Sequence, residues 1–188
     1  MNICVYGASG DRLDRAYFDA AERLGELIGQ GGHSLIFGGG QNGLMGACAR
    51  GVSREKGKIT GFAPRFFAEP GILYPHCTEF IFTETMGQRK AAMEDAAQAF
   101  IVLPGGIGTF EELTEIICHR QLGIYHGNIV LLNINGFYDP FIATLHSAIT
   151  AGFMPSDHAR LWTTANNAAA ALSKALTPAS TTHLSPKF

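Results

Sequence analysis

The stretch Phe100-Ile101-Val102-Leu103-Pro104-Gly105-Gly106-Ile107-Gly108-Thr109 decides the fold of this chain. It opens with a continuous apolar run, Phe100–Leu103, which predicts a strand that is buried on both faces. A glycine-rich turn follows, and a helical pattern then covers Thr109–Leu122. A strand, a tight glycine turn and a helix in this order form the βα unit of a parallel sheet.

The same alternation of short β-rich runs and longer helical patterns extends in both directions from this stretch. The other predicted strands are Ile3–Tyr6, Ser34–Phe37, Ile59–Phe62, Glu79–Thr83 and Ile129–Asn133. The other predicted helices are Ala16–Gln30, Leu44–Lys56, Met86–Ala97 and Tyr138–Ala151, the last of them ended by Gly152. This rhythm predicts an α/β fold, with a Rossmann-like doubly wound parallel sheet in a single domain over residues 1–178. We expect the Ser/Thr/Pro-rich residues 179–188 to form a flexible tail.

The composition and charge favour a single cytoplasmic domain. The chain has 188 residues, of which 46% are hydrophobic, and this is ample for one packed core. Its formal net charge of -2 argues against nucleic acid and anionic membrane surfaces as partners. No basic segment precedes the first apolar run, and no stretch approaches the ~20 apolar residues of a membrane helix, so we expect a cytoplasmic location.

Cysteine and histidine residues do not indicate a metal site. Cys4, Cys48, Cys77 and Cys118 are scattered without a C-x-x-C pair, which predicts buried thiols instead of zinc ligands or disulfides. The seven histidines also lack a metal-ligand spacing, so we expect structural or surface roles for them.

Three glycine-rich turns follow predicted strands, at Gly7–Gly10, Gly38–Gly43 and Gly105–Thr109. In a doubly wound sheet all three emerge at the carboxyl edge, where ligands bind. Glycine lets the backbone approach an anion, and the first amides of the following helix point at it, so phosphate is the expected ligand. Ser9 could add a hydroxyl from the first turn. The alternative is that such turns need glycine for their geometry alone, although three turns on one edge weaken it.

Two common nucleotide-binding motifs are excluded. The dinucleotide fingerprint needs G-x-G-x-x-G after the first strand and an acid near the end of the second. Here the second strand runs directly into Gly38–Gly40, which leaves no acid to hold a ribose. The P-loop is excluded because no Gly-Lys-Ser or Gly-Lys-Thr occurs in the chain.

Pro104-Gly105-Gly106-Ile107-Gly108-Thr109-Phe110-Glu111-Glu112 resembles the P-G-G-x-G-T-x-x-E motif of the LOG (LONELY GUY) family, long described as lysine decarboxylases. Further matches in the same order are Gly38–Gly40 with Gly43–Gly46, Met86-x-x-Arg89-Lys90 and Gln121–Ile124, so the resemblance extends to about residue 170. One departure is Gly87-Gln88, where many relatives have a histidine after the methionine. The resemblance implies hydrolysis of the N-glycosidic bond of cytokinin riboside 5′-monophosphates, and often of AMP, without a metal or cofactor.

Breaking an N-glycosidic bond develops positive charge on the ribose and negative charge on the departing purine, so a carboxylate and a cation are wanted there. Glu111 and Glu112 are expected in the first turn of a helix, where its dipole would lower the pKa of a carboxyl group. Acids are also favoured at helix N-termini for stability alone. Arg89 and Lys90 lie where a dipole disfavours cations, which indicates a nearby anion. For Lys90, an i,i+4 pair with Glu94 is the plainer alternative.

The resemblance and the residues together give one candidate site. Arg89 and Glu112 are the predicted catalytic residues, and Thr109 is expected to offer a hydroxyl at the N-cap or N1 position. The predicted substrate-binding residues are Ser9, Gly39, Gly40, Gly43, Met86, Lys90, Gly105, Gly106, Ile107, Gly108, Thr109 and Glu111.

Two other functions and one partner are also considered. Related Rossmann-like proteins with this glycine motif are proposed to bind molybdenum cofactor, so a non-catalytic carrier is the alternative to an enzyme. A lysine decarboxylase would need a Schiff-base lysine and an acid at the pyridinium nitrogen of its cofactor. A homodimer is expected from the apolar Ile116 and Ile117 and from the segment Leu122–Tyr125, as well as from the family.

Overall fold

The computed structural model describes residues 1–69 and 71–178. Over this part of the chain, seven parallel strands form one sheet in the order β4-β3-β2-β1-β5-β6-β7. The strands are β1 (Asn2–Tyr6), β2 (Ser34–Phe37), β3 (Lys58–Pro64), β4 (Glu79–Thr83), β5 (Ala99–Val102), β6 (Asn128–Leu132) and β7 (Thr163–Ala165). The order reverses between β1 and β5, so this is the topological switch point of a doubly wound sheet.

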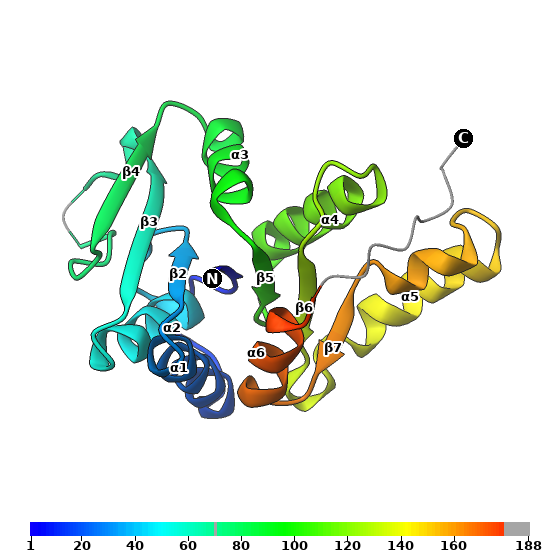
Figure 1. The fold of residues 1–188 in the computed structure, drawn as a ribbon, viewed down its shortest axis with the longest axis horizontal. Helices are drawn as coiled ribbons and strands as arrows, with labels where there is room; N and C mark the ends of the chain where they lie inside the picture. The colour runs from blue at the N-terminus through cyan, green and yellow to red at the C-terminus, as the bar shows by residue number, and fades with distance from the viewer. Residues whose placement is uncertain (70, 179–188) are drawn as a thin grey trace.

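Helices cover both faces of the sheet (Figure 1). In the described residues they are α1 (Arg15–Gln30), α2 (Gly43–Arg54), α3 (Met86–Ala96), α4 (Ile107–Gln121), α5 (Asp139–Thr150) and α6 (Ala168–Leu176), with short 3-10 helices at Arg65–Phe67, Ile134–Gly136 and Ser156–Arg160. Helices α1, α2 and α6 pack on one face, and α3, α4 and α5 on the other. The predicted Rossmann-like α/β fold is confirmed.

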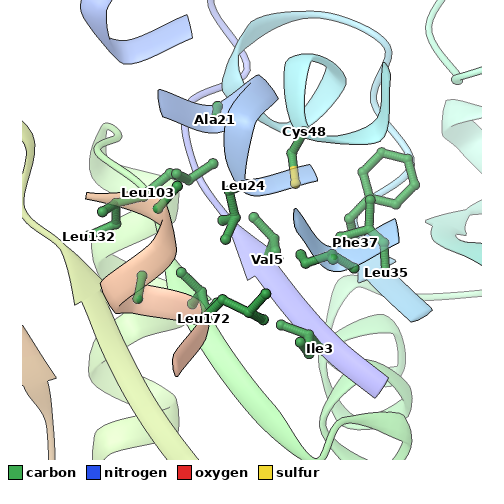
Figure 2. Packing of buried hydrophobic residues seen from close by; sticks show 14 of the residues in the cluster. Ile3, Val5, Ala21, Leu24, Leu35, Phe37, Cys48, Leu103, Leu132 and Leu172 are labelled. Atoms are coloured by element: carbon green, nitrogen blue, oxygen red, sulfur yellow. The ribbon is translucent and has the colours of Figure 1, made fainter. Parts of the chain in front are cut away.

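The alternation of side chains along β1 divides the core into two layers. Ile3 and Val5 point toward α1, α2 and α6, and Figure 2 shows them packed with Leu24 of α1 and Leu172 of α6. Cys4 and its neighbours on the opposite face belong to the layer under α3 and α4. Because successive strand residues face opposite sides, a central strand that is buried on both faces must be apolar throughout.

The predicted elements agree with the observed ones to within two residues at each end over the first 151 residues. The last strand and helix were not predicted, since β7 has only three residues and α6 is a short alanine-rich segment. Gly152 follows the end of α5 with φ +81°, as expected for a glycine that ends a helix. The predicted flexible tail, residues 179–188, lies outside the described residues. Among the helices that are described, none is long and apolar enough to cross a membrane.

The argument for a dimer from Ile116 and Ile117 is wrong in this structure. Both side chains are buried in the core of their own subunit, as is Tyr125. Leu122 and Ile124 are different, because they remain 50% and 63% exposed. Of the residues on which the dimer prediction rests, Leu122 and Ile124 are therefore the ones that keep apolar side chains on the surface.

Candidate functional site

The glycine turns after β1 and β5 meet at the switch point. The amide of Ala8 donates to the carbonyl of Pro104 at 3.0 Å. A Cβ atom on Gly105 would lie 3.0 Å from the amide nitrogen of Ala8 and 2.1 Å from Oγ1 of Thr109. Any larger residue would therefore separate the two turns, so the glycine is needed for their close approach.

The N-terminus of α4 is open to an anion from outside the protein. The helix begins at Ile107, its N-cap is Gly106, and within the described chain no side chain caps it. The amides of the first helical residues have no intrahelical acceptor, and they carry the positive end of the helix dipole. Gly106, Ile107 and Gly108 are all exposed. These amides can bind a phosphate group.

Thr109 lies in this turn, but not where the sequence placed it. It is the third residue of α4 instead of the N-cap or N1 residue, and it is 5% exposed because its side chain packs against Gly105. The prediction of an N-cap hydroxyl is therefore wrong. The buried side chain instead fixes the shape of the turn that presents the amides.

The N-terminus of α2 is already occupied by the protein itself. Oδ1 of Asp11 accepts a hydrogen bond from the amide of Gly43 at 2.7 Å, and the carbonyl of Ala8 accepts from Leu44 at 2.9 Å. Gly43 has φ +63°, and a Cβ atom there would lie 2.3 Å from the Ala8 oxygen. Asp11, the residue after the first glycine turn, thus binds the amide at the N-terminus of α2 and holds the two turns together.

The other glycines of the second turn also make contacts inside the protein. A Cβ atom on Gly39 would lie 2.7 Å from the ring of Phe80, and Gly39 has φ +78°. The Gly39 carbonyl accepts from the amide of Tyr74 at 2.8 Å. Gly40 is less confined, with Met45 as its nearest neighbour at 4.0 Å. Of the predicted substrate-binding glycines in this turn, Gly40 has the most free space.

Helix α3 is fixed at its start by a capping box, and this places Arg89. Oγ1 of Thr85 accepts from the amide of Gln88 at 3.1 Å, while Oε1 of Gln88 accepts from the amide of Thr85 at 3.2 Å. Nε of Arg89, one residue on, donates to the carbonyl of Phe62 in β3 at 3.1 Å. The guanidinium lies over Gly38 at the end of β2, where a Cβ atom would be 2.0 Å from Nη2.

Arg89 and Glu112 form a nearly buried ion pair. Nη1 of Arg89 donates to Oε1 of Glu112 at 2.9 Å, and the two side chains are 7% and 12% exposed. Burial raises the pKa of Glu112, and the positive charge of Arg89 opposes this without cancelling it. The two predicted catalytic residues are therefore brought together from helices α3 and α4.

The predicted effect of the helix dipole on Glu112 is wrong. Because α4 begins at Ile107, Glu111 and Glu112 lie in its second turn, where the dipole has little influence. The pKa of Glu112 is raised instead of lowered, since loss of water around the carboxylate dominates. The sequence pattern could not show how deeply α3 would bury this side chain.

Lys90 pairs with α4 and not with its own helix. Nζ contacts Oε1 of Glu111 and lies 2.9 Å from Oε2 of Glu115. Burial alone would lower the pKa of Lys90, but hydrogen bonds to these two carboxylates leave it raised. Glu94, the i,i+4 alternative, instead pairs with Nδ1 of His119 at 2.6 Å. The anions expected near Arg89 and Lys90 are thus carboxylates of the neighbouring helix.

Several residues around the pair were not among the predicted site residues. Glu115 lies one helical turn beyond Glu111, and this i,i+4 spacing was the available signal. Gly38 was quoted in a motif but had no predicted contact. Tyr6 lies behind the pair in the core, where burial and the nearby charge of Glu112 raise the pKa of its phenol. An apolar strand pattern does not distinguish such a tyrosine from any other core residue.

The remaining predicted residues lie at the rim. Ser9 is exposed in the first turn, and Met86 is the exposed first residue of α3. The described chain contains no cluster of three or more histidine, cysteine or acidic side chains that could hold a metal ion. Of the four free thiols, Cys4 and Cys48 are buried as predicted, whereas Cys77 and Cys118 are only half-buried.

This fold and site define a Rossmann-like α/β protein with an open anion-binding turn at its switch point, beside a buried arginine–glutamate pair. A family model described as "Possible lysine decarboxylase" matches residues 45–175. A cytokinin riboside 5′-monophosphate phosphoribohydrolase of Arabidopsis thaliana is 40% identical over 88% of this chain and 78% of its own length. A second, from Oryza sativa subsp. japonica, is 39% identical over 85% of this chain and 66% of its own length. The chain belongs to this family, the LOG family.

Solved structures with the same fold include proteins of a different described role. The molybdenum cofactor binding protein of Rippkaea orientalis has a TM-score of 0.70 and 19% identity, covering 92% of this chain and 93% of that one. The Moco carrier protein of Chlamydomonas reinhardtii has a TM-score of 0.70 and 21% identity, with the same coverage. At this level of identity the likeness concerns the fold alone.

Proposed function

We propose that this chain hydrolyses the N-glycosidic bond of cytokinin riboside 5′-monophosphates, of AMP, or of both, releasing the free base and ribose 5-phosphate. The observation that carries the proposal is the buried Arg89–Glu112 pair, with its 2.9 Å contact, beside the open N-terminus of α4. A phosphate-binding turn next to a carboxylate and a cation supplies the three groups that this reaction needs. The named activity of the relatives supports the same conclusion.

The proposed binding mode begins at the phosphate. The amides of the turn Gly105–Thr109 bind the 5′-phosphate, and Ser9 contributes its hydroxyl from the neighbouring turn. Gly40 and the rest of the second glycine turn line the same edge of the sheet. The ribose then lies toward the Arg89–Glu112 pair, because Glu112 belongs to the helix that begins at this turn and the pair is shielded from solvent.

The chemistry follows from the charges of the pair. Water attacks C1′ of the ribose while the bond from C1′ to the base nitrogen breaks, and the purine leaves with the electron pair. Glu112 stabilises the developing positive charge on the sugar and accepts the proton from water. Its raised pKa makes it a better base than an exposed glutamate. Arg89 stabilises the negative charge on the departing purine, which then takes a proton from solvent.

Lys90, Glu111 and Glu115 support this pair from the side. Their contacts join α3 to α4, and in this way they fix the distance between the side chains of Arg89 and Glu112. We assign Lys90 and Glu111 to substrate binding at the ribose, as the sequence predicts, and Glu115 to holding Lys90 in place.

The first experiment removes the charge of Glu112. Purified protein and the Glu112→Gln variant are incubated with AMP and with isopentenyladenosine 5′-monophosphate, and free base is detected. We expect turnover to fall at least about 10²-fold, the range for loss of a general base. Glu55→Gln, an exposed carboxylate at the end of α2, is the matched control. Wild-type turnover in Glu112→Gln would remove Glu112 from the mechanism.

The second experiment removes the phosphate from the substrate. Hydrogen bonds to a charged group contribute about 1.5–3 kcal/mol each, so losing two of them corresponds to roughly 10²-fold or more in kcat/KM. Adenosine should therefore be a far poorer substrate than AMP. Equal rates on the two compounds would show that the turn at α4 does not bind the phosphate.

The alternative of a non-catalytic cofactor carrier has less support. The carrier proteins share the fold at about one fifth identity, whereas the named phosphoribohydrolases share more than a third of their residues with this chain. The paired Arg89 and Glu112 also favour an enzyme, since binding alone does not need a buried carboxylate next to a phosphate turn.

We also propose that the protein is a homodimer. Helix α5 is mostly apolar, yet in the described structure it contributes no fully buried residue. Leu122 and Ile124, just after α4, and Phe153, just after α5, are exposed. Light scattering should give the mass of a dimer, and Ile124→Asp should shift it toward the monomer. A wild-type monomer with full activity at assay concentration would contradict the proposal.

A cytoplasmic location completes the proposal. All four cysteines lie in the described part of the chain and are free thiols, although oxidising compartments favour disulfides. Fractionation of cells that express the protein tests this location directly, and recovery in an exported fraction would contradict it. We further assign residues 1–178 to the hydrolase domain, and a truncation after residue 178 that keeps full turnover would support this boundary.

A further inference from the structure

The chain that follows β3 returns to the second glycine turn and pairs with it. Residues 71–74, which we call the bridging segment, run antiparallel to the turn, and Leu73 and Gly40 form an isolated antiparallel bridge. Beside this bridge, the amide of Gln41 donates to the carbonyl of Ile72 at 3.0 Å. The turn after β2 therefore has a partner of its own, in addition to the neighbours of β2 in the sheet.

Three consecutive glycines give this turn little intrinsic preference for one shape. Gly38–Gly40 have no side chains that could restrict the backbone, and Gly39 has φ +78°, in the region that glycine favours. Such a segment loses much conformational freedom when it adopts one shape, so contacts with other parts of the chain must hold it there. The hydrogen bond from the Tyr74 amide to the Gly39 carbonyl, at 2.8 Å, is one of these contacts.

Gln41, the residue directly after the three glycines, makes further contacts on two sides. Its side-chain Nε2 donates to the carbonyl of Gly71 in the bridging segment. Its own carbonyl accepts from Nη1 of Arg50 in α2 at 3.1 Å. Together with the backbone bond to Ile72, these contacts join the bridging segment to α2 through Gln41. The bond to Gly71 needs a donor, which a carboxylate or an apolar side chain of the same length does not offer.

The same turn lies against the guanidinium of Arg89. The capping box fixes the backbone at the start of α3, but the far end of this long side chain depends on its own contacts. These are the carbonyl of Phe62, the carboxylate of Glu112 at 2.9 Å and the backbone of Gly38, where a Cβ atom would lie 2.0 Å from Nη2. A change in the shape of the turn therefore changes the position of the guanidinium.

We propose that Gln41 is a positioning residue for the reaction: its contacts hold the three-glycine turn in the shape that keeps the guanidinium of Arg89 against Glu112. This inference rests on the proposed function. In the described chain Gln41 has no hydrogen bond to either residue of the pair, so it acts through the turn. Its side-chain amide and its bond from Arg50 can each be removed while the pair itself stays intact in sequence.

The test removes these two contacts of Gln41 one at a time. Gln41→Met keeps the length of the side chain but removes the donor to Gly71, and Arg50→Ala removes the donor to the Gln41 carbonyl. Each variant should lower kcat for AMP roughly tenfold, less than the ~10²-fold loss for a displacement of about 1 Å. KM for AMP should stay within about twofold, because neither change touches the phosphate turn after β5. Arg50 is exposed, so its variant keeps the test valid even where Gln41→Met does not fold.

The pH profile of kcat separates positioning from a general loss of stability. The charge of Arg89 lowers the pKa of Glu112 against the effect of burial, while Glu111 raises this pKa and Lys90 lowers it. Tyr6, behind the pair, stays neutral because burial raises the pKa of its phenol. A guanidinium that moves away from Glu112 raises the pKa of that carboxyl group, so the decline of kcat on the acid side should move to higher pH in both variants. A protein that is merely less stable would keep the wild-type midpoint.

Gln30→Met is the matched control for these variants. Gln30 is an exposed glutamine at the end of α1, and its Nε2 donates to Oε1 of Glu55 at 3.0 Å. The same substitution thus removes a similar hydrogen bond away from the turn, and kcat and its pH profile should not change. Wild-type kcat in both test variants, an unmoved midpoint on the acid side, or a rise in KM without a fall in kcat would each overturn the proposal. A wild-type protein that releases no base from AMP would instead refute the proposed function.

Discussion

Replacing Gly38 with alanine tests how closely the second glycine turn controls the position of Arg89, the arginine that we propose to be catalytic. The new Cβ atom would lie 2.0 Å from Nη2 and 3.1 Å from Cζ of Arg89, whereas ordinary contact begins at 3.4 Å. Gly38 does not have a positive φ, so alanine introduces no backbone strain there. The guanidinium must therefore move by more than 1 Å, away from its position against Glu112.

The expected effect on activity is larger than the effect on stability. A displacement of about 1 Å in a positioned catalytic group lowers the rate on the order of 10²-fold. Loss of the hydrogen bond to Glu112 should lower the free energy of unfolding by about 1.5–3 kcal/mol, which corresponds to about 2–4 °C in Tm for each kcal/mol. Release of free base from AMP and a thermal melt measure the two effects.

Gly87→Ala is the matched control for this substitution. Gly87 lies in α3 two residues before Arg89, and its new Cβ atom would lie 3.9 Å from Oγ1 of Thr85, its nearest neighbour. This variant should keep its turnover and gain a little helix stability. If Gly38→Ala keeps more than half of the wild-type kcat/KM on AMP, the contact between the turn and the guanidinium does not position the catalytic group.

Three further predictions concern the groups around the site. Because burial raises the pKa of Glu112, kcat/KM should decline on the acid side at a higher pH than an exposed glutamate would give. Glu111→Gln removes a neighbouring negative charge and should move this decline to lower pH, so identical pH profiles of wild type and variant would contradict the prediction. Tyr138→Phe should lower the free energy of unfolding by roughly 1–3 kcal/mol in a denaturant titration, since the buried hydroxyl donates at 2.7 Å to the carbonyl of Leu103, just after β5. Tyr17→Phe, at a half-buried position, serves as the control, and equal unfolding midpoints of the two variants would refute the expectation. Thr85→Ala removes the N-cap of α3, the helix that bears Arg89, and should lower the free energy of unfolding by about 1 kcal/mol and also reduce turnover. Thr85→Ser should retain both, and full activity of the alanine variant would show that the cap does not position α3.

Local patterns were sufficient for the fold. The apolar run before Pro104 and the glycines after it specify a buried strand and a tight turn, and these requirements do not depend on distant residues. The segment Thr163–Leu176 was missed because a three-residue strand and an alanine-rich helix carry little periodic signal. Its position is set by packing of Ala165 and Leu172 against the rest of the core.

The site was predictable in its residues but not in its contacts. The motif indicated Arg89 and Glu112, whereas the pairing of Lys90 with Glu111 and Glu115 depends on how α3 crosses α4, which no local pattern encodes. The pKa of Glu112 was predicted with the wrong sign for the same reason. Helix position can be read from the sequence, but the amount of water that a neighbouring helix excludes cannot.

The hydrogen bond from Gly43 to Asp11 has a consequence for the number of phosphates that the protein can accept. The N-terminus of α2, at the same edge of the sheet as that of α4, is neutralised from within by a carboxylate 2.7 Å from its first amide. A second phosphate that approached this turn would meet a negative charge of the protein instead of free amides. We therefore expect the enzyme to discriminate by charge count, accepting monophosphates and rejecting ADP and ATP even though the same base and sugar are present.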